Sequence, residues 1–154
     1  MPRTSARYLS AALMLACPLL ADSALACSTG AQALTALTEL RERSDQLYRE
    51  TAAIEANLED AIARRAREAG WDKKQTETFR RSIVEDPDYL SLHRSREEGA
   101  ALAAKGLAKL IMAAATEHPS VICAEMPKVR FANQRLRVLL DLEYAWLNRK
   151  IWGN

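Results

Sequence analysis

Apolar and small residues recur at steps of three and four along residues 31–69, a segment without proline or glycine. The stripe consists of Leu37, Leu40, Ser44, Leu47, Thr51, Ile54, Leu58 and Ala61. This spacing is typical of one face of a long helix, and the two hydroxyl residues favour a bundle helix over an autonomous coiled coil. Ser28 or Thr29 can cap the start of this helix, and Gly70 can supply the left-handed residue that ends it.

A short second helix is predicted over residues 73–84. Asp72 precedes it and is a suitable N-cap residue. The apolar side of this helix is narrow, since it contains only Phe79, Ile83 and Val84.

Two more helices complete an all-α pattern. Proline is favoured in the first turn of a helix, so Asp86 or Pro87 opens a third helix that runs to about residue 117. Small residues fill its second half, which allows neighbouring helix axes to approach closely. After a predicted loop over residues 118–127, the last helix runs over about residues 128–152 with a broad apolar face.

The first 26 residues have the features of a secretory signal peptide in the required order. Arg3 and Arg7 give a positive start, an apolar stretch of about 12 residues follows, and Ala24-Leu25-Ala26 matches the pattern of a signal-peptidase site. We therefore expect a periplasmic or secreted protein of the bacterial envelope. Residues 27–154 would form its single mature domain, with no further run long enough to cross a membrane.

Cleavage would make Cys27 the first mature residue and would leave Cys123 as the second remaining cysteine. An even pair in an oxidising compartment favours a disulfide, worth on the order of 4–5 kcal/mol in the chain-entropy model. Ala24-Leu25-Ala26-Cys27 also resembles a bacterial lipobox, with Ala24 where leucine is usual, and that resemblance implies acylation of Cys27. Acylation and two free thiols are the open alternatives.

The expected disulfide constrains the topology of the bundle. Its two Cα atoms must lie within about 7 Å of each other, so Cys27 and Cys123 must lie at the same end. A full up-down-up-down bundle would place them at opposite ends. We therefore predict a small antiparallel bundle of three long helices, with the short helix capping the far end of the first.

Composition and charge narrow the class of function. With 49% hydrophobic residues the chain is not disordered, and a net charge of +2 excludes a strongly basic nucleic-acid binder. The only histidines are His93 and His118, and the chain contains no nucleophile, phosphate-loop or metal motif. We expect no enzymatic activity, no cofactor and no resident metal.

Three residue sets are candidates for contact with a partner. Tyr89, His93 and Glu97 would follow one another at one-turn steps and could form a polar ridge for a partner or a weak metal site. The simpler interpretation is a solvated helix start, with acidic residues that suit the helix dipole.

A basic set and an aromatic set fall in the last helix. Lys128, Arg130, Arg135 and Arg137 oppose the helix dipole, so they suit an acidic partner or an anionic lipid surface, or they pair with the acidic first helix. Tyr144, Trp146 and Trp152 lie among basic residues, as interface anchors often do, or they close the end of the core.

These observations favour a non-enzymatic binding module that contacts another envelope or secreted protein. An immunity protein or inhibitor is one version, and a chaperone-like protein is another. The alternative is a structural or assembly lipoprotein anchored through Cys27. A homo-oligomer is compatible with either, and nucleic acid is not an expected partner.

Overall fold

Four helices account for nearly all of the chain that the computed structural model describes, which is residues 30–116 and 119–153. In chain order these are α2 (Gly30–Ala69), α3 (Lys73–Val84), α4 (Pro87–Ala115) and α5 (Pro119–Trp152). The predicted signal peptide and Cys27 lie outside the described residues. None of the four helices combines the length and apolar composition that a membrane-spanning helix needs.

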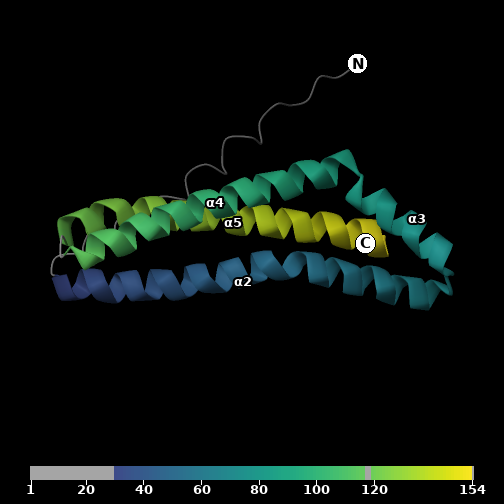
Figure 1. Ribbon diagram of the computed structural model, residues 1–154, viewed down its shortest axis with the longest axis horizontal. Coiled ribbons are helices and arrows are strands. Elements are labelled where there is room, and N and C mark those ends of the chain that lie inside the picture. The colour runs from purple at the N-terminus through teal and green to yellow at the C-terminus, as the bar shows by residue number, and fades with distance from the viewer. Residues whose placement is uncertain (1–29, 117–118, 154) are drawn as a thin grey trace, which may run out of the picture.

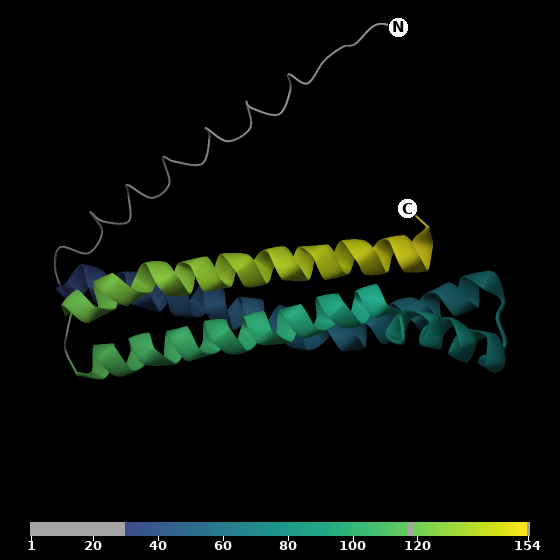
Figure 2. The same ribbon diagram turned by 90° about the horizontal axis from the view of Figure 1, so that it is seen from above.

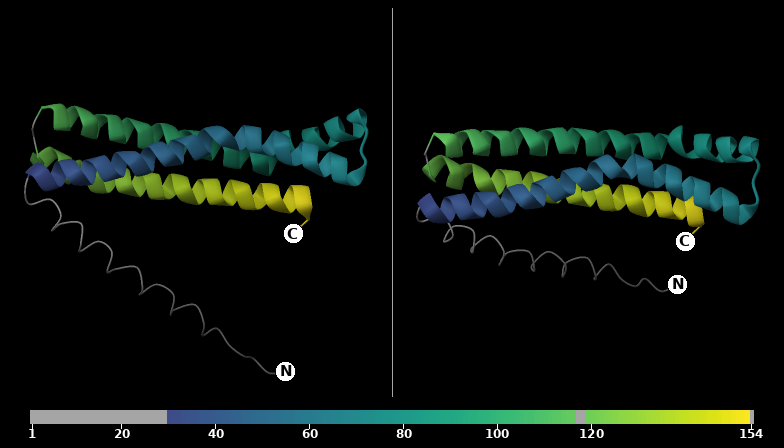
Figure 3. Two further views of the ribbon diagram at one scale, coloured as in Figure 1. Left: turned by 90° about the horizontal axis from the view of Figure 1, so that it is seen from below. Right: turned by 60° about the horizontal axis from the view of Figure 1, so that its bottom comes forward.

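The three long helices form an antiparallel bundle, as predicted. In Figure 1, α2 and α5 run in the same direction and α4 runs in the opposite direction, with α3 at the end of the bundle where α2 finishes. Figures 2 and 3 show the same order from other sides, with the starts of α2 and α5 at one end of the bundle. The prediction of a short helix capping three long ones is confirmed.

Local signals in the sequence set the end of α2 and the starts of α3 and α4. Gly70 has a φ of 67°, a left-handed conformation that stops α2. Asp72 then forms a capping box with Gln75, in which each side chain accepts a hydrogen bond from the other residue's backbone N–H. Asp86 caps α4, and Pro87 occupies its first turn.

The predicted start of the last helix is wrong. Helix α5 begins at Pro119, so that Pro127 lies inside the helix and Cys123 lies on it, not in a loop. A proline cannot donate the backbone hydrogen bond that Cys123 C=O would otherwise accept, which is why Pro127 suggested a helix boundary. Ile122 and Met126 are buried in the core, and their burial offsets that loss.

The core consists of two apolar clusters with a polar contact between them. One surrounds Leu58 and Leu140, and the other surrounds Leu37 and Val129. Between them, Ser44 Oγ donates to Leu40 C=O at 2.8 Å and accepts a hydrogen bond from Asn133 Nδ2 at 2.6 Å. The serine that weakens the stripe of α2 is therefore a residue that joins α2 to α5.

Close approach of α4 and α5 explains the two glycines inside α4. A Cβ atom on Gly106 would lie 3.1 Å from Val129 Cγ2, and one on Gly99 would lie 3.1 Å from Leu139 Cδ1. Each glycine costs about 1 kcal/mol of helix propensity relative to alanine. Packing between α4 and α5 compensates for that cost.

The starts of α2 and α5 are neighbours, which is the arrangement that the expected disulfide requires. A Cβ atom on Gly30 would lie 3.5 Å from Pro119 Cγ. Cys123 is half-buried, one turn into α5, and packs against the second apolar cluster. Because Cys27 lies outside the described residues, the Cys27–Cys123 disulfide remains a prediction.

Asp86 ties the start of α4 to the end of α5. Its carboxylate accepts hydrogen bonds from Lys150 Nζ at 2.9 Å and from the backbone N–H of Asp88 at 3.0 Å. The Lys150 hydrogen bond is the main reason that the pKa of Asp86 lies below its usual value. This carboxylate therefore stabilises the fold above its unfolded-state pKa, about 3.9, and the contribution is lost as the pH falls through the lower folded-state value.

We predict that Asp86→Asn lowers the stability of the bundle at neutral pH, because asparagine keeps the helix cap and loses the charge. The difference from the wild type should shrink as the pH falls below about 4. Urea unfolding followed by circular dichroism across this pH range measures it, and Lys150→Met should show the same loss. A difference that does not change with pH would contradict the charge-based account.

Candidate functional site

A buried ion pair joins α4 to α5 near the middle of the bundle. Arg96 is 1% exposed and Glu143 is 0% exposed, and Arg96 Nε lies 2.6 Å from Glu143 Oε2. Arg96 Nη1 donates to Thr51 C=O of α2 at 3.3 Å and to Glu97 Oε1 at 2.7 Å. One guanidinium group therefore contacts all three long helices.

His93 completes this buried cluster. Its Nδ1 atom lies 2.8 Å from Arg96 Nη2 and 3.6 Å from Glu143 Oε1. Because a guanidinium can only donate, His93 Nδ1 is the acceptor in its contact with Arg96. The ring of Tyr89 lies 5.7 Å from that of His93, and burial raises the pKa of Tyr89. Among the described residues, Glu143 Oε1 has no hydrogen-bond partner.

The structure does not bring Tyr89, His93 and Glu97 together as one exposed ridge. Tyr89 is buried in the core, His93 is partly buried beside Glu143, and only Glu97 is exposed. Within residues 30–116 and 119–153, no three His, Cys, Asp or Glu side chains are grouped so that they could hold a metal ion. The buried charged residues of this cluster are Arg96 and Glu143, and neither of them was predicted as a site residue from the sequence.

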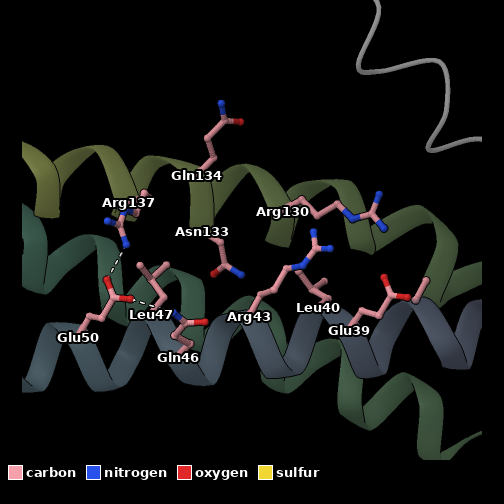
Figure 4. Close-up of a pocket in the computed structure, with 11 residues that line it drawn as sticks. Glu39, Leu40, Arg43, Gln46, Leu47, Glu50, Arg130, Asn133, Gln134 and Arg137 are labelled. Carbon is pink, nitrogen blue, oxygen red and sulfur yellow. Dashed lines mark hydrogen bonds and ion pairs between the residues drawn. The ribbon is translucent and has the colours of Figure 1, made fainter.

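The predicted basic cluster on α5 is divided between two grooves. Arg130 and Arg137 line a groove of about 640 Å³ between α2 and α5 (Figure 4). Arg137 pairs there with Glu50 of α2 at 2.5 Å and with Asp141 of its own helix at 3.1 Å. The cross-helix pairing with the acidic first helix thus occurs for Arg137.

Lys128 and Arg135 line a second groove of about 350 Å³ between α4 and α5, which we call the α4–α5 groove. None of its lining residues comes from α2. The lining residues are Leu102, Lys105, Gly106, Lys109, Glu125, Lys128, Val129, Phe131, Ala132 and Arg135. Gly106 and Ala132 are the small residues of this lining, and Gly106 lies where α4 and α5 approach closely.

The rim of the α4–α5 groove is both apolar and basic. Phe131 is 68% exposed and Leu102 is 56% exposed. Four cationic side chains surround them, together with Glu125, which pairs with Lys128 at 2.5 Å. The other three cations, on Lys105, Lys109 and Arg135, form no ion pair with any residue in the described parts of the chain.

The aromatic residues near the C-terminus pack against the first apolar cluster. Tyr144, Trp146 and Trp152 are all partly buried. The hydroxyl of Tyr144 accepts a hydrogen bond from Asn57 Nδ2 at 3.2 Å, and the rings of Trp146 and Tyr89 lie 5.7 Å apart. The guanidinium of Arg64 lies 5.8 Å from the Trp152 ring centroid. These rings close one end of the core and do not line the α4–α5 groove.

Comparison with protein families, with curated proteins and with solved structures finds no match to this chain.

We predict that Arg96→Met destabilises the bundle by about 3–5 kcal/mol, because Glu143 is then a buried charge without its partner. The double variant Arg96→Met/Glu143→Leu should recover most of this loss, since it removes both charges and keeps the volume. The measurement is the free energy of unfolding in urea.

An exposed ion pair provides the control. Arg81 lies 3.4 Å from Glu77 on the surface of α3, and Arg81→Met should cost less than about 1 kcal/mol. A double variant at positions 96 and 143 that is no more stable than Arg96→Met would show that the lone charge is not the cause.

Proposed function

We propose that this chain is an exported, non-enzymatic binding module that contacts another envelope or secreted protein through the α4–α5 groove. The observation that carries the proposal is the exposed ring of Phe131 beside cations that have no partner among the described residues. Aromatic side chains, phenylalanine among them, and arginine side chains are enriched in protein interfaces.

The apolar rim continues along α5 beyond the groove. Val138 and Leu142 are about half exposed and follow Phe131 at helical steps that keep them on the same side of α5. Large contiguous patches of exposed apolar surface are uncommon on monomeric proteins, and such patches often mark interaction sites. A partner that covers this strip would bury Phe131, Leu102, Val138 and Leu142 together.

The small volume of the α4–α5 groove favours a protein that recognises one specific partner over a chaperone-like protein. A chaperone-like holdase needs a broad concave apolar face, whereas the α4–α5 groove holds about 350 Å³ and has charges along its rim. A narrow groove with charges supports recognition of one specific partner, as in an immunity protein or inhibitor. Anchoring through an acylated Cys27, with an assembly role, is the alternative, and it would leave the groove available to a partner.

Intact mass spectrometry of the protein purified from its host tests the export and the state of Cys27. We expect a chain that begins at Cys27 and is two hydrogens lighter than the dithiol form, because the starts of α2 and α5 are adjacent. A mass increased by lipid would support the anchored alternative. Two free thiols, or an uncleaved chain, would contradict this part of the proposal.

Photo-crosslinking from the groove tests the binding function itself. With benzoylphenylalanine in place of Phe131, we expect ultraviolet light to yield one dominant protein adduct in the host. Leu34 of α2 is 51% exposed and does not line the groove, so the same probe at position 34 is the matched control. The partner, once identified, should bind the purified chain and lose affinity with Arg135→Glu. Equal labelling from positions 34 and 131, or no protein adduct from 131, would overturn the proposal.

A further inference from the structure

We infer that the occupant of the α4–α5 groove is an acidic amphipathic helix of the partner protein. This inference rests on the proposed function and names the chemistry of the partner. Three properties of the groove lead to it: the sign of its charge, its shape, and the lack of suitable charge in the chain's own segments.

Charge comes first. Lys105 and Lys109 line one side of the groove and Lys128 and Arg135 line the other, so the cations flank the apolar rim from both helices. The single carboxylate, that of Glu125, already pairs with Lys128. A partner with carboxylates on both sides of an apolar strip would match this arrangement, because complementary potentials across an interface fix orientation and exclude wrong partners.

Shape favours a helix. The groove lies between two antiparallel helices, and its floor is formed by Gly106, Val129 and Ala132. A concave floor accepts side chains that project from a convex surface, which is how an amphipathic helix lies in a helical groove. From Phe131 to Leu142 the strip is about 17 Å long, enough for about three turns of a partner helix. That helix would present apolar residues at steps of three and four with Glu or Asp beside them.

A second copy of this chain and the chain's own residues 1–29 both have the wrong charge to occupy the α4–α5 groove. In a symmetric dimer the same patch meets itself, so the cations of the groove would face cations, with Glu125 already paired. Residues 1–29 of the chain contain Arg3, Arg7 and one acidic residue, Asp22, so they cannot neutralise the rim. An anionic bilayer has a suitable charge but presents a surface that does not fill the concave floor, and it is tested below.

The test uses three probes on the purified chain. The first is a labelled synthetic helix with Leu and Phe on one face and Glu on the other, and the second has Lys in place of every Glu. The third is a vesicle of phosphatidylglycerol. We expect saturable binding of the Glu peptide, measured by fluorescence anisotropy and weakened by added salt. We expect no binding of the Lys peptide and no sedimentation of the chain with the vesicles.

Matched variants locate the binding. Lys109→Glu/Arg135→Glu should weaken binding of the Glu peptide by at least about tenfold, since it reverses two charges at the rim. Lys73→Glu/Lys74→Glu makes the same change in net charge on exposed residues of α3 and should leave the affinity unchanged. Phe131→Ser should abolish binding and Phe131→Leu should retain most of it. Circular dichroism of each variant shows whether it is folded.

Several results would overturn the inference. These are equal binding of the Lys peptide, no saturable binding of the Glu peptide up to about 1 mM, and an effect of the α3 variant equal to that of the groove variant. Vesicle binding that Lys109→Glu/Arg135→Glu abolishes, without peptide binding, would assign the groove to an anionic lipid surface. If position 131 still yields a protein adduct when the peptide fails, the binding function stands and only the acidic helix is rejected.

Discussion

The buried ion pair between Arg96 and Glu143 sets how α4 lies against α5. Both groups are removed from water, so a shift of one helix by a single turn, about 5.4 Å, would leave two isolated charges in the core. Arg96 also donates to Thr51 C=O, which ties α2 to the same point. Residues of both helices line the α4–α5 groove. Their positions relative to one another therefore depend on the alignment of α4 and α5 that this ion pair sets.

Much of the fold could be predicted from the sequence because its signals are local. Gly70, the Asp72–Gln75 capping box and Asp86-Pro87 act within a few residues and set the end of α2 and the starts of α3 and α4. The start of α5 could not be predicted in the same way. A proline inside a helix is a local signal to stop, and it is outweighed there by burial of Ile122 and Met126, which depends on packing against α2 and α4.

The candidate site could be predicted only in part. The four basic residues of α5 were recognised, and their spacing already separates Lys128 and Arg135 from Arg130 and Arg137 around a helix. Lys105 and Lys109 join the first two only through the packing of α4 on α5. Glu143 occupies a step in the stripe of Leu136, Leu140 and Leu147, and a charge at a core position is the signal that could have revealed it.

Pro127 lies in the part of α5 that lines the α4–α5 groove. The backbone hydrogen-bond ladder of α5 lacks one donor at this residue, and Ile122, Met126 and Cys123 of the preceding turns pack in the second apolar cluster. Glu125 lies on the near side of this interruption, whereas Lys128, Phe131 and Arg135 lie on the far side. The lining that α5 gives to the groove therefore spans the missing backbone hydrogen bond of Pro127, and the Glu125–Lys128 ion pair joins the two sides of it.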